Sequence, residues 1–222
     1  MLLAGASTTA CGSSKDEAKP AASPSAKVPT AEELKPGLLV LSDMPTGYSA
    51  GEQKTTSTPE PNDTSSVQAG TAECDRLFNE FDSGGNGQAE VSAEFKKAAT
   101  GPFVKQALKS YRDAAELQRD MGQISEAVEK CGEFTVKESD GEAKVEIDNA
   151  SFPKLGDETA AFKLQATVTS GGRKVVLGGY LVAVRVGNVV STVISFGLPT
   201  VDAAETEQIT RKAVDKVTPI AK

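Results

Sequence analysis

Apolar and polar residues alternate through most of the stretch 133–197, and this pattern predicts antiparallel strands. The alternation runs through 134–136 and 143–147, with Asp140-Gly141 between them as a hairpin turn. Three further strands are predicted, separated by glycine turns, at 162–168, 174–186 and 189–196. Because the run at 174–186 is almost continuously apolar, it is typical of a central strand covered on both faces.

Apolar residues spaced by three and four positions predict helices on both sides of this meander. The stretches before it with this spacing are 71–81, 104–115 and 124–131, with a break near Met121-Gly122 between the last two. After the meander, Asp202 and Glu205 form a capping-box pattern, and apolar residues then recur every four positions. The sequence therefore predicts a final helix that begins after Asp202.

The remaining stretches complete the fold prediction. The apolar run 38–48 is expected to dock on the core, 50–66 is predicted as a loop because it is rich in Thr, Ser and Pro, and 89–95 alternates like a strand. Helices followed by a run of strands indicate the α+β class. We expect an antiparallel β-meander sheet with helices packed on one face, an α/β sandwich.

Composition divides the 222 residues into three parts. Residues 1–11 are interpreted as the remnant of a lipoprotein signal peptide, with the true start of translation further upstream. Residues 12–34 are rich in Pro, Ala, Ser and Lys and predict a disordered tether that cannot bury a core. Residues 35–219 are predicted to form a single globular domain. No apolar run reaches the roughly 18 residues of a transmembrane helix.

Cys11 is the predicted lipidation site. It follows small and apolar residues and precedes Gly-Ser-Ser, as the acylated cysteine of bacterial lipoproteins does. Thr8 stands where such signals usually carry an apolar residue, and the alternative is a frayed terminus with an incidental cysteine. A diacylated cysteine would hold the protein stably on a membrane. We therefore expect a protein that is exported and anchored to the outer face of the cell membrane.

Charge and composition exclude several functions. The formal net charge of −7 argues against nucleic-acid binding, which requires clustered Lys and Arg. Histidine is absent, so the commonest general base and metal ligand are both missing. The stretch 82–93 resembles a calcium loop but has Gly84 and Ala93 where ligands are needed. No metal, cofactor or enzymatic activity is expected.

Two serine motifs fail in their context. Ser49 lies in a Gly-x-Ser-x-Gly pattern, but a nucleophilic serine of that type needs a histidine base and a strand–turn–helix setting. Ser151 and Lys154 form a Ser-x-x-Lys pattern, but Pro153 obstructs the helix that would bring them together. A histidine-free hydrolase that uses Ser49 stays a remote alternative.

Cys74 and Cys131 are predicted to form a disulfide. Both lie on apolar faces of different predicted helices, from which they could meet in the core, and an exported protein would oxidise them. The alternative is a pair of buried free thiols if the export signal is illusory.

Arg185, Asp157 and Glu158 are the charged residues that interrupt the apolar pattern and could line a cleft. Arg185 lies in the central strand and needs a carboxylate partner. It could bind an anionic ligand, although pairing with a structural acid is favoured. Asp157-Glu158 could line a polar cleft, although a turn before the next strand is favoured.

Five features taken together resemble actinobacterial exported lipoproteins similar to the PknH-type extracellular sensor domain of Ser/Thr kinases. They are 38–48, Cys74, Cys131, 155–161 and 184–187. The resemblance covers about residues 38–217 and implies an α/β sandwich with a cleft and a role in sensing or binding outside the membrane. Those sensor domains carry two disulfides, whereas only one internal cysteine pair is available here.

The sequence therefore predicts a membrane-anchored cell-surface lipoprotein with a ligand-binding or sensing domain and no catalysis. Its expected partners are the membrane, through Cys11, and an envelope ligand or protein of unknown identity. The alternative is a carrier of a lipid or other hydrophobic ligand in the cell envelope.

Overall fold

The computed structural model describes residues 27–56, 71, 74–75, 87–138, 141–170, 172–198 and 200–221. The predictions for Cys11, for most of the helix at 71–81 and for residues 82–86 of the calcium-like loop lie outside these described residues. Within them, no helix has the length and apolar character needed to cross a membrane.

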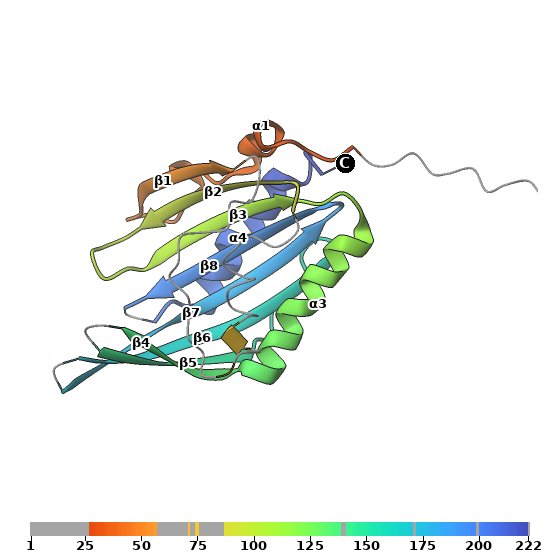
Figure 1. Cartoon of the computed structure of the whole chain (residues 1–222). Coiled ribbons are helices and arrows are strands. Elements are labelled where there is room, and N and C mark those ends of the chain that lie inside the picture. The colour runs from red at the N-terminus through yellow and green to blue at the C-terminus, as the bar shows by residue number, and fades with distance from the viewer. Residues whose placement is uncertain are drawn as a thin grey trace, which may run out of the picture.

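Short helical turns come first in the chain, followed by strands and two longer helices (Figure 1). The helical elements are α1 (Ala31–Leu34), η1 (Lys35–Gly37), η2 (Leu41–Asp43), α3 (Ala114–Cys131) and α4 (Ala203–Val217). The strands are β1 (Ser49–Thr56), β2 (Ala89–Lys96), β3 (Phe103–Ser110), β4 (Glu133–Glu138), β5 (Gly141–Asn149), β6 (Glu158–Ser170), β7 (Arg173–Val186) and β8 (Val189–Gly197).

The strands form one eight-stranded antiparallel sheet in the order β1-β2-β3-β8-β7-β6-β5-β4. The predicted meander is confirmed as β4 to β8, and the predicted strand at 89–95 is β2. After β3, helix α3 carries the chain to the far edge of the sheet, and the meander then returns to place β8 beside β3. Strands β1 to β3 form a first meander and β4 to β8 a second, and the β3–β8 pairing joins the two into one sheet.

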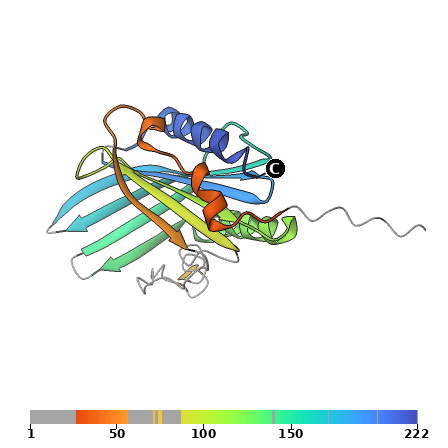
Figure 2. The same cartoon turned by 90° about the horizontal axis from the view of Figure 1, so that it is seen from above.

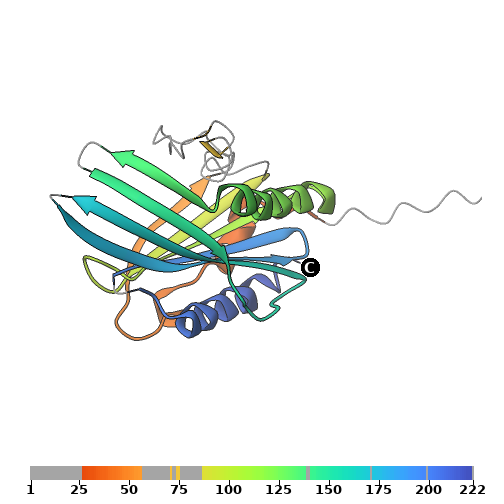
Figure 3. The ribbon, with the colours of Figure 1, turned by 90° about the horizontal axis from the view of Figure 1, so that it is seen from below.

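The α+β class is confirmed, but the expectation that the helices share one face of the sheet is wrong. Figures 2 and 3 show α3 and α4 on opposite sides of the sheet. Val189 and Val193 of β8 pack with Ile209 of α4, whereas Val190 packs with Leu117 of α3. Both faces of the central strands are apolar, and each needs its own helix to cover it.

The predicted helix at 104–115 is wrong, because 103–110 is strand β3. Val104 and Leu108 are buried on one face, and Gln106 between them is fully buried too. A polar residue at this core position hides the period-two pattern, so Val104, Ala107 and Leu108 look helical in sequence.

The predicted break near Gly122 is also wrong, because α3 is continuous from Ala114 to Cys131. Gly122 lies on the exposed side of the helix, and a side chain added there would meet nothing within 4 Å. The glycine lowers helix propensity without breaking the helix, because the apolar face on the other side packs against the sheet.

The folded part begins earlier than the predicted boundary at residue 35. Thr30 caps α1 with a capping box, and Leu34 is completely buried in the main core. The run 38–48 docks on that core as predicted, through Leu39 and Met44 among others. Residues 50–56, predicted as the start of the loop 50–66, instead belong to the exposed edge strand β1. Their polar side chains suit an edge strand that packs little surface.

Candidate functional site

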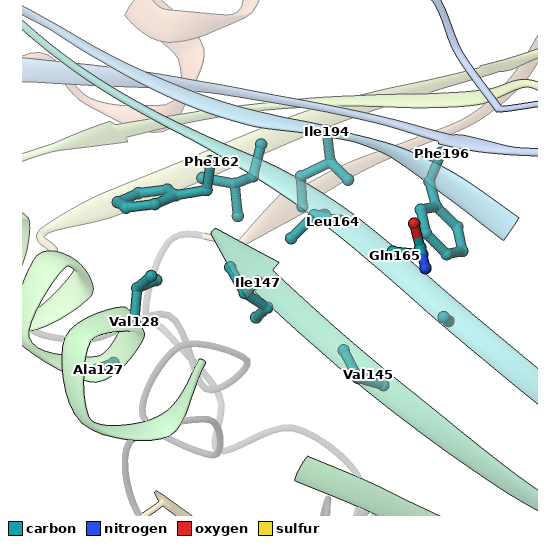
Figure 4. A pocket seen from close by; sticks show the side chains of 11 residues that line it. Ala127, Val128, Val145, Ile147, Phe162, Leu164, Gln165, Ile194 and Phe196 are labelled. Atoms are coloured by element: carbon teal, nitrogen blue, oxygen red, sulfur yellow. The ribbon is translucent and has the colours of Figure 1, made fainter. Parts of the chain in front are cut away.

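An apolar pocket lies between α3 and the sheet (Figure 4). Its volume is about 420 Å³, within the range of about 300–1,000 Å³ that is usual for small-molecule sites. The helix, β5, β6, β7 and β8 all contribute to its walls. The lining residues are Ala127, Val128, Val145, Ile147, Phe162, Leu164, Gln165, Ala166, Leu181, Ile194 and Phe196.

Strand alternation places these side chains on one face of the sheet. Phe162, Leu164 and Ala166 are two residues apart on β6 and therefore point the same way. Leu164 pairs with Ile147 of β5, and Ala166 pairs with Val145. The alternation that predicted these strands also supplies the floor of the pocket.

Gly179 allows β7 and β8 to approach each other closely beside the pocket. It stands on β7 between Leu164 of β6 and Phe196 of β8, in direct register with both. A side chain there would have its Cβ only 1.8 Å from the carbonyl oxygen of Ser195, so the close strand approach requires glycine. In the row Leu164–Gly179–Phe196, two large apolar side chains line the pocket, and the β8 backbone comes close to the glycine between them.

The disulfide holds the helical wall of the pocket. Cys74 and Cys131 are bonded, with 5.6 Å between their Cα atoms, as the sequence predicted. Cys131 ends α3 and packs in one cluster with Ala127 and Phe134. Since Ala127 also lines the pocket, the cross-link ties the residues around Cys74 to the end of the helix that forms the pocket wall.

None of the described residues that line the pocket carries a charge. Its one polar residue, Gln165, turns its amide away from the pocket and donates a hydrogen bond of 3.4 Å to Glu146. Among the residues that the structure describes, no group of three or more His, Cys, Asp or Glu side chains could hold a metal ion. The described lining of the pocket is therefore suited to contact an apolar ligand.

The structure brings Arg185, Asp157 and Glu158 together, but away from the pocket. The Arg185 guanidinium lies 3.4 Å from a carboxylate oxygen of Glu158 and 3.7 Å from one of Asp157. The Asp157 carboxylate also accepts a hydrogen bond of 2.7 Å from the backbone of Gly187. These contacts hold the loop before β6 against the β7–β8 turn. The positive charge of Arg185 is thus paired with the two carboxylates.

A second polar cluster joins two loops to the first turn of α4. The Tyr48 hydroxyl donates to Glu205 at 2.6 Å, and the Lys97 ammonium lies 2.7 Å from the same carboxylate. Burial, followed by the nearby Glu205 carboxylate, raises the pKa of Tyr48 well above its usual range. Asp202 caps α4 as predicted, through the Ala204 amide, while Glu205 is used in this cluster. The cluster is structural, because its charges are paired.

A third polar cluster lies between α3 and β3. Tyr111 is almost completely buried, and burial, with the Asp120 carboxylate next in importance, raises its pKa. Burial lowers the pKa of Lys109, although Glu90, at 3.8 Å, opposes the shift. These groups lie outside the lining of the pocket.

The serine motifs take positions that do not suit catalysis. Ser49 opens the edge strand β1, and its hydroxyl donates to the backbone oxygen of Lys96 at 3.1 Å. Strand β1 follows Ser49, so the helix required by a nucleophile elbow is not there. Ser151 and Lys154 lie in the coil between β5 and β6.

The carrier alternative implied an apolar cavity between helices and sheet, but the residues that line the pocket were not identified from the sequence. The available signal was the Gly178-Gly179 pair inside an otherwise apolar strand, because an interior strand glycine often marks a place where another group approaches closely. The arrangement defines a class of protein: an open antiparallel α+β sheet, covered by helices on both faces, with an apolar pocket under one helix.

Comparison with known proteins assigns this fold. The chain is similar to the extracellular domain of PknH from Mycobacterium tuberculosis, with 16% identity, a TM-score of 0.62 and coverage of 87% of this chain and 99% of that one. A Mycobacterium smegmatis protein described as an Rv0999 ortholog aligns at 13% identity, a TM-score of 0.43 and coverage of 88% and 98%. No protein-family model matches the chain, and no curated protein matches it significantly. The predicted resemblance to the PknH-type sensor domain is confirmed at the level of the fold.

Proposed function

We propose that this protein is a membrane-anchored lipoprotein on the cell surface whose folded domain binds a small apolar ligand without catalysis. The observation that carries the proposal is the pocket between α3 and the sheet, with its uncharged lining. The likeness of the fold to an extracellular domain supports a binding or sensing role outside the membrane. The Cys11 context supports export and anchoring.

The driving force for binding is the removal of apolar surface from water. Each Å² of apolar surface that a ligand buries contributes about 25 cal/mol before the cost of association is subtracted. Because the pocket walls are held by strand pairing and by a disulfide, the site is largely formed before the ligand arrives. A preformed site loses little free energy to ordering.

Ligand binding can be tested with Nile red, a neutral fluorescent dye that brightens in apolar surroundings. Ala166→Trp adds a large side chain inside the pocket, and we expect it to abolish the fluorescence increase seen with the unchanged domain. Thr167→Trp is the matched control, because Thr167 is next to Ala166 on β6 but points to the opposite face and is not among the pocket-lining residues. Equal dye binding by both variants and the unchanged domain would contradict the proposal.

Anchoring through Cys11 needs a separate test in the host, from the full-length gene product. We expect the protein to incorporate a radiolabelled acyl chain and to sediment with membranes. Cys11→Ala should lose both properties while the folded domain stays intact. A wild-type protein without label, which fractionates as Cys11→Ala does, would refute anchoring.

The second candidate function is a carrier of lipid or another hydrophobic ligand, and the same pocket favours it. A carrier must release its ligand to a second membrane, whereas a sensor retains it. Transfer of a fluorescent lipid between two populations of vesicles, accelerated by the domain in proportion to its concentration, would select the carrier.

A further inference from the structure

Two lysines extend the row of pocket residues onto neighbouring strands. Phe196, at the β8 wall of the pocket, pairs directly with Phe103 of β3, and Phe103 pairs with Lys96 of β2. One row along, the pocket residue Ile194 pairs with Lys105 of β3. Directly paired residues in an antiparallel sheet point to the same face. The side chains of Phe103, Lys96 and Lys105 therefore lie on the face that carries the pocket.

These three side chains are accessible. Phe103 is 42% exposed, and both lysines are exposed. Lys105 and Lys96 form no ion pair with any other residue that the structure describes, in contrast to Lys97 and Lys109, which pair with Glu205 and Glu90. An apolar path thus leads from the pocket across Phe103 and ends beside two ammonium groups that form no ion pair within the described part of the chain.

Glu94 of β2 is an acidic residue beside this site. It pairs in register with Lys105 on the side away from the pocket, so that Lys105 stands between Glu94 and Ile194. The two lysines and Glu94 together carry two positive charges and one negative charge, which leaves one net positive charge. This local excess contrasts with the formal net charge of −7 of the whole chain.

We propose that the ligand is an amphiphile, with one apolar chain and one anionic group at its end. This inference rests on the proposed function of the pocket and names the class of ligand. The chain lies in the pocket and crosses Phe196 and Phe103, and the anionic group lies beside Lys105, with Lys96 as the second cation. From β6 to β3 is three strand spacings, about 14 Å, which suits an extended alkyl chain. A carboxylate or a phosphate monoester would have the required charge.

The test compares three ligands that share a twelve-carbon chain: dodecanoate, its methyl ester and dodecylamine, each displacing Nile red from the domain. We expect dodecanoate to bind best. Lys105→Ala should weaken dodecanoate about fivefold, close to 1 kcal/mol, and leave the ester unchanged, because an exposed charge pair contributes about that much. Lys105→Glu should reverse the preference toward dodecylamine.

Lys163→Ala is the control, because Lys163 is an exposed lysine next to the pocket residues Phe162 and Leu164 on β6 that points to the opposite face. It should change none of the three affinities. A dodecyl phosphate arm separates the two sources of anion: tighter binding than dodecanoate identifies a phosphate ligand, and weaker binding a carboxylate. Both outcomes support an anionic amphiphile.

Failure of this inference can be told from failure of the proposed function. If the ester binds as tightly as dodecanoate and Ala166→Trp blocks both, the pocket binds apolar ligands and the anionic group is refuted. If Lys105→Ala weakens all three ligands equally, the role of its charge is refuted too. If neither the dye nor any of the ligands binds, the proposed function itself is wrong.

Discussion

At the scale of single residues, Gln106 links the N-terminal segment to the sheet. Its side chain is completely buried, accepts a hydrogen bond of 2.6 Å from the Leu39 amide and donates one of 3.2 Å to the Gly37 carbonyl. A buried polar side chain is tolerated only when its groups are paired, and here the partners are backbone groups that also need pairing. Gln106 therefore orients the segment that follows α1.

We predict that Gln106→Leu lowers the free energy of unfolding by about 2–4 kcal/mol. The change leaves the Leu39 amide and the Gly37 carbonyl buried without their partner, and each loss costs about 1–3 kcal/mol. Urea unfolding followed by circular dichroism measures the effect.

Ser195→Ala is the matched control for Gln106→Leu. Ser195 is also fully buried on the sheet, but its hydroxyl has no hydrogen-bond partner in the described part of the chain. Removing that hydroxyl should cost little or stabilise the protein. An equal loss in both variants would show that partner groups do not determine the effect.

Asp43 provides a test of electrostatics at the same scale. Burial alone would raise the pKa of its carboxyl, but the Val40 amide and the Lys216 ammonium, at 3.0 Å, outweigh it and lower the pKa. A lowered pKa in the folded state means that the ionised form stabilises the fold. This stabilisation is complete above the ordinary pKa of about 4 and is lost as the pH falls below it.

We therefore predict that Asp43→Asn destabilises the domain at pH 6 and has a smaller effect at pH 3. At pH 3, below the ordinary pKa, the unfolded chain binds a proton at Asp43 more readily than the folded protein does, so part of the stabilisation by the ionised carboxyl is lost. The measurement is the urea midpoint of both proteins at the two pH values. A difference in midpoint that stays constant between pH 3 and pH 6 would show that the charge of Asp43 is not responsible.

At the scale of elements, the two glycines that interrupt apolar patterns have opposite roles. Gly122 lies on the open side of α3, where an added Cβ meets nothing within 4 Å. Gly179 lies in the centre of the sheet, where an added Cβ meets the Ser195 backbone. Local sequence does not separate these cases, because the difference lies in what the tertiary fold places beside each Cα atom.

We predict that Gly122→Ala raises the free energy of unfolding by about 0.5–1 kcal/mol, because alanine loses less backbone entropy in a helix. Gly179→Ala should lower it, because the β7–β8 strand pair must move apart. Thermal unfolding of the two variants measures both shifts. Stabilisation by both would mean that β7 and β8 can separate at no cost.

The elements also show why the sequence predicted some stretches better than others. The strands β5 to β8 were predicted because alternation or a continuous apolar run continues over most of each strand. Strand β3 was missed because Gln106 occupies a core position, where only its tertiary partners make a polar residue acceptable. Helix α3 was wrongly predicted to break at Gly122. Helix propensity counts a glycine as unfavourable at any position, whether or not the rest of the helix packs against a sheet.

At the scale of the whole molecule, the disulfide ties a distant segment to the end of α3. It closes a loop of 57 residues, for which the chain-entropy model gives a stabilisation of about 4 kcal/mol. The bonded Cys131 packs beside Ala127, which forms part of the pocket wall. Stability and ligand binding should therefore depend on the same bond.

We predict that reduction lowers the free energy of unfolding by up to about 4 kcal/mol and weakens Nile red binding. Urea titration with and without a phosphine reductant measures the first effect, and dye titration the second. The double variant Cys74→Ser/Cys131→Ser should behave like the reduced protein and be insensitive to reductant. Identical urea midpoints for oxidised and reduced protein would contradict the stabilising role.

The sequence by itself determined the features that depend on neighbours along the chain: the β4–β8 meander, the Asp202 cap and the burial of both internal cysteines. Strand alternation and capping are local, so a short stretch contains the whole signal. The tertiary structure alone decided that β8 lies beside β3, that α3 and α4 cover opposite faces, and that Arg185 pairs with Asp157 and Glu158. The pocket belongs to this second group, because a cavity is space left between elements, and no element contains it alone.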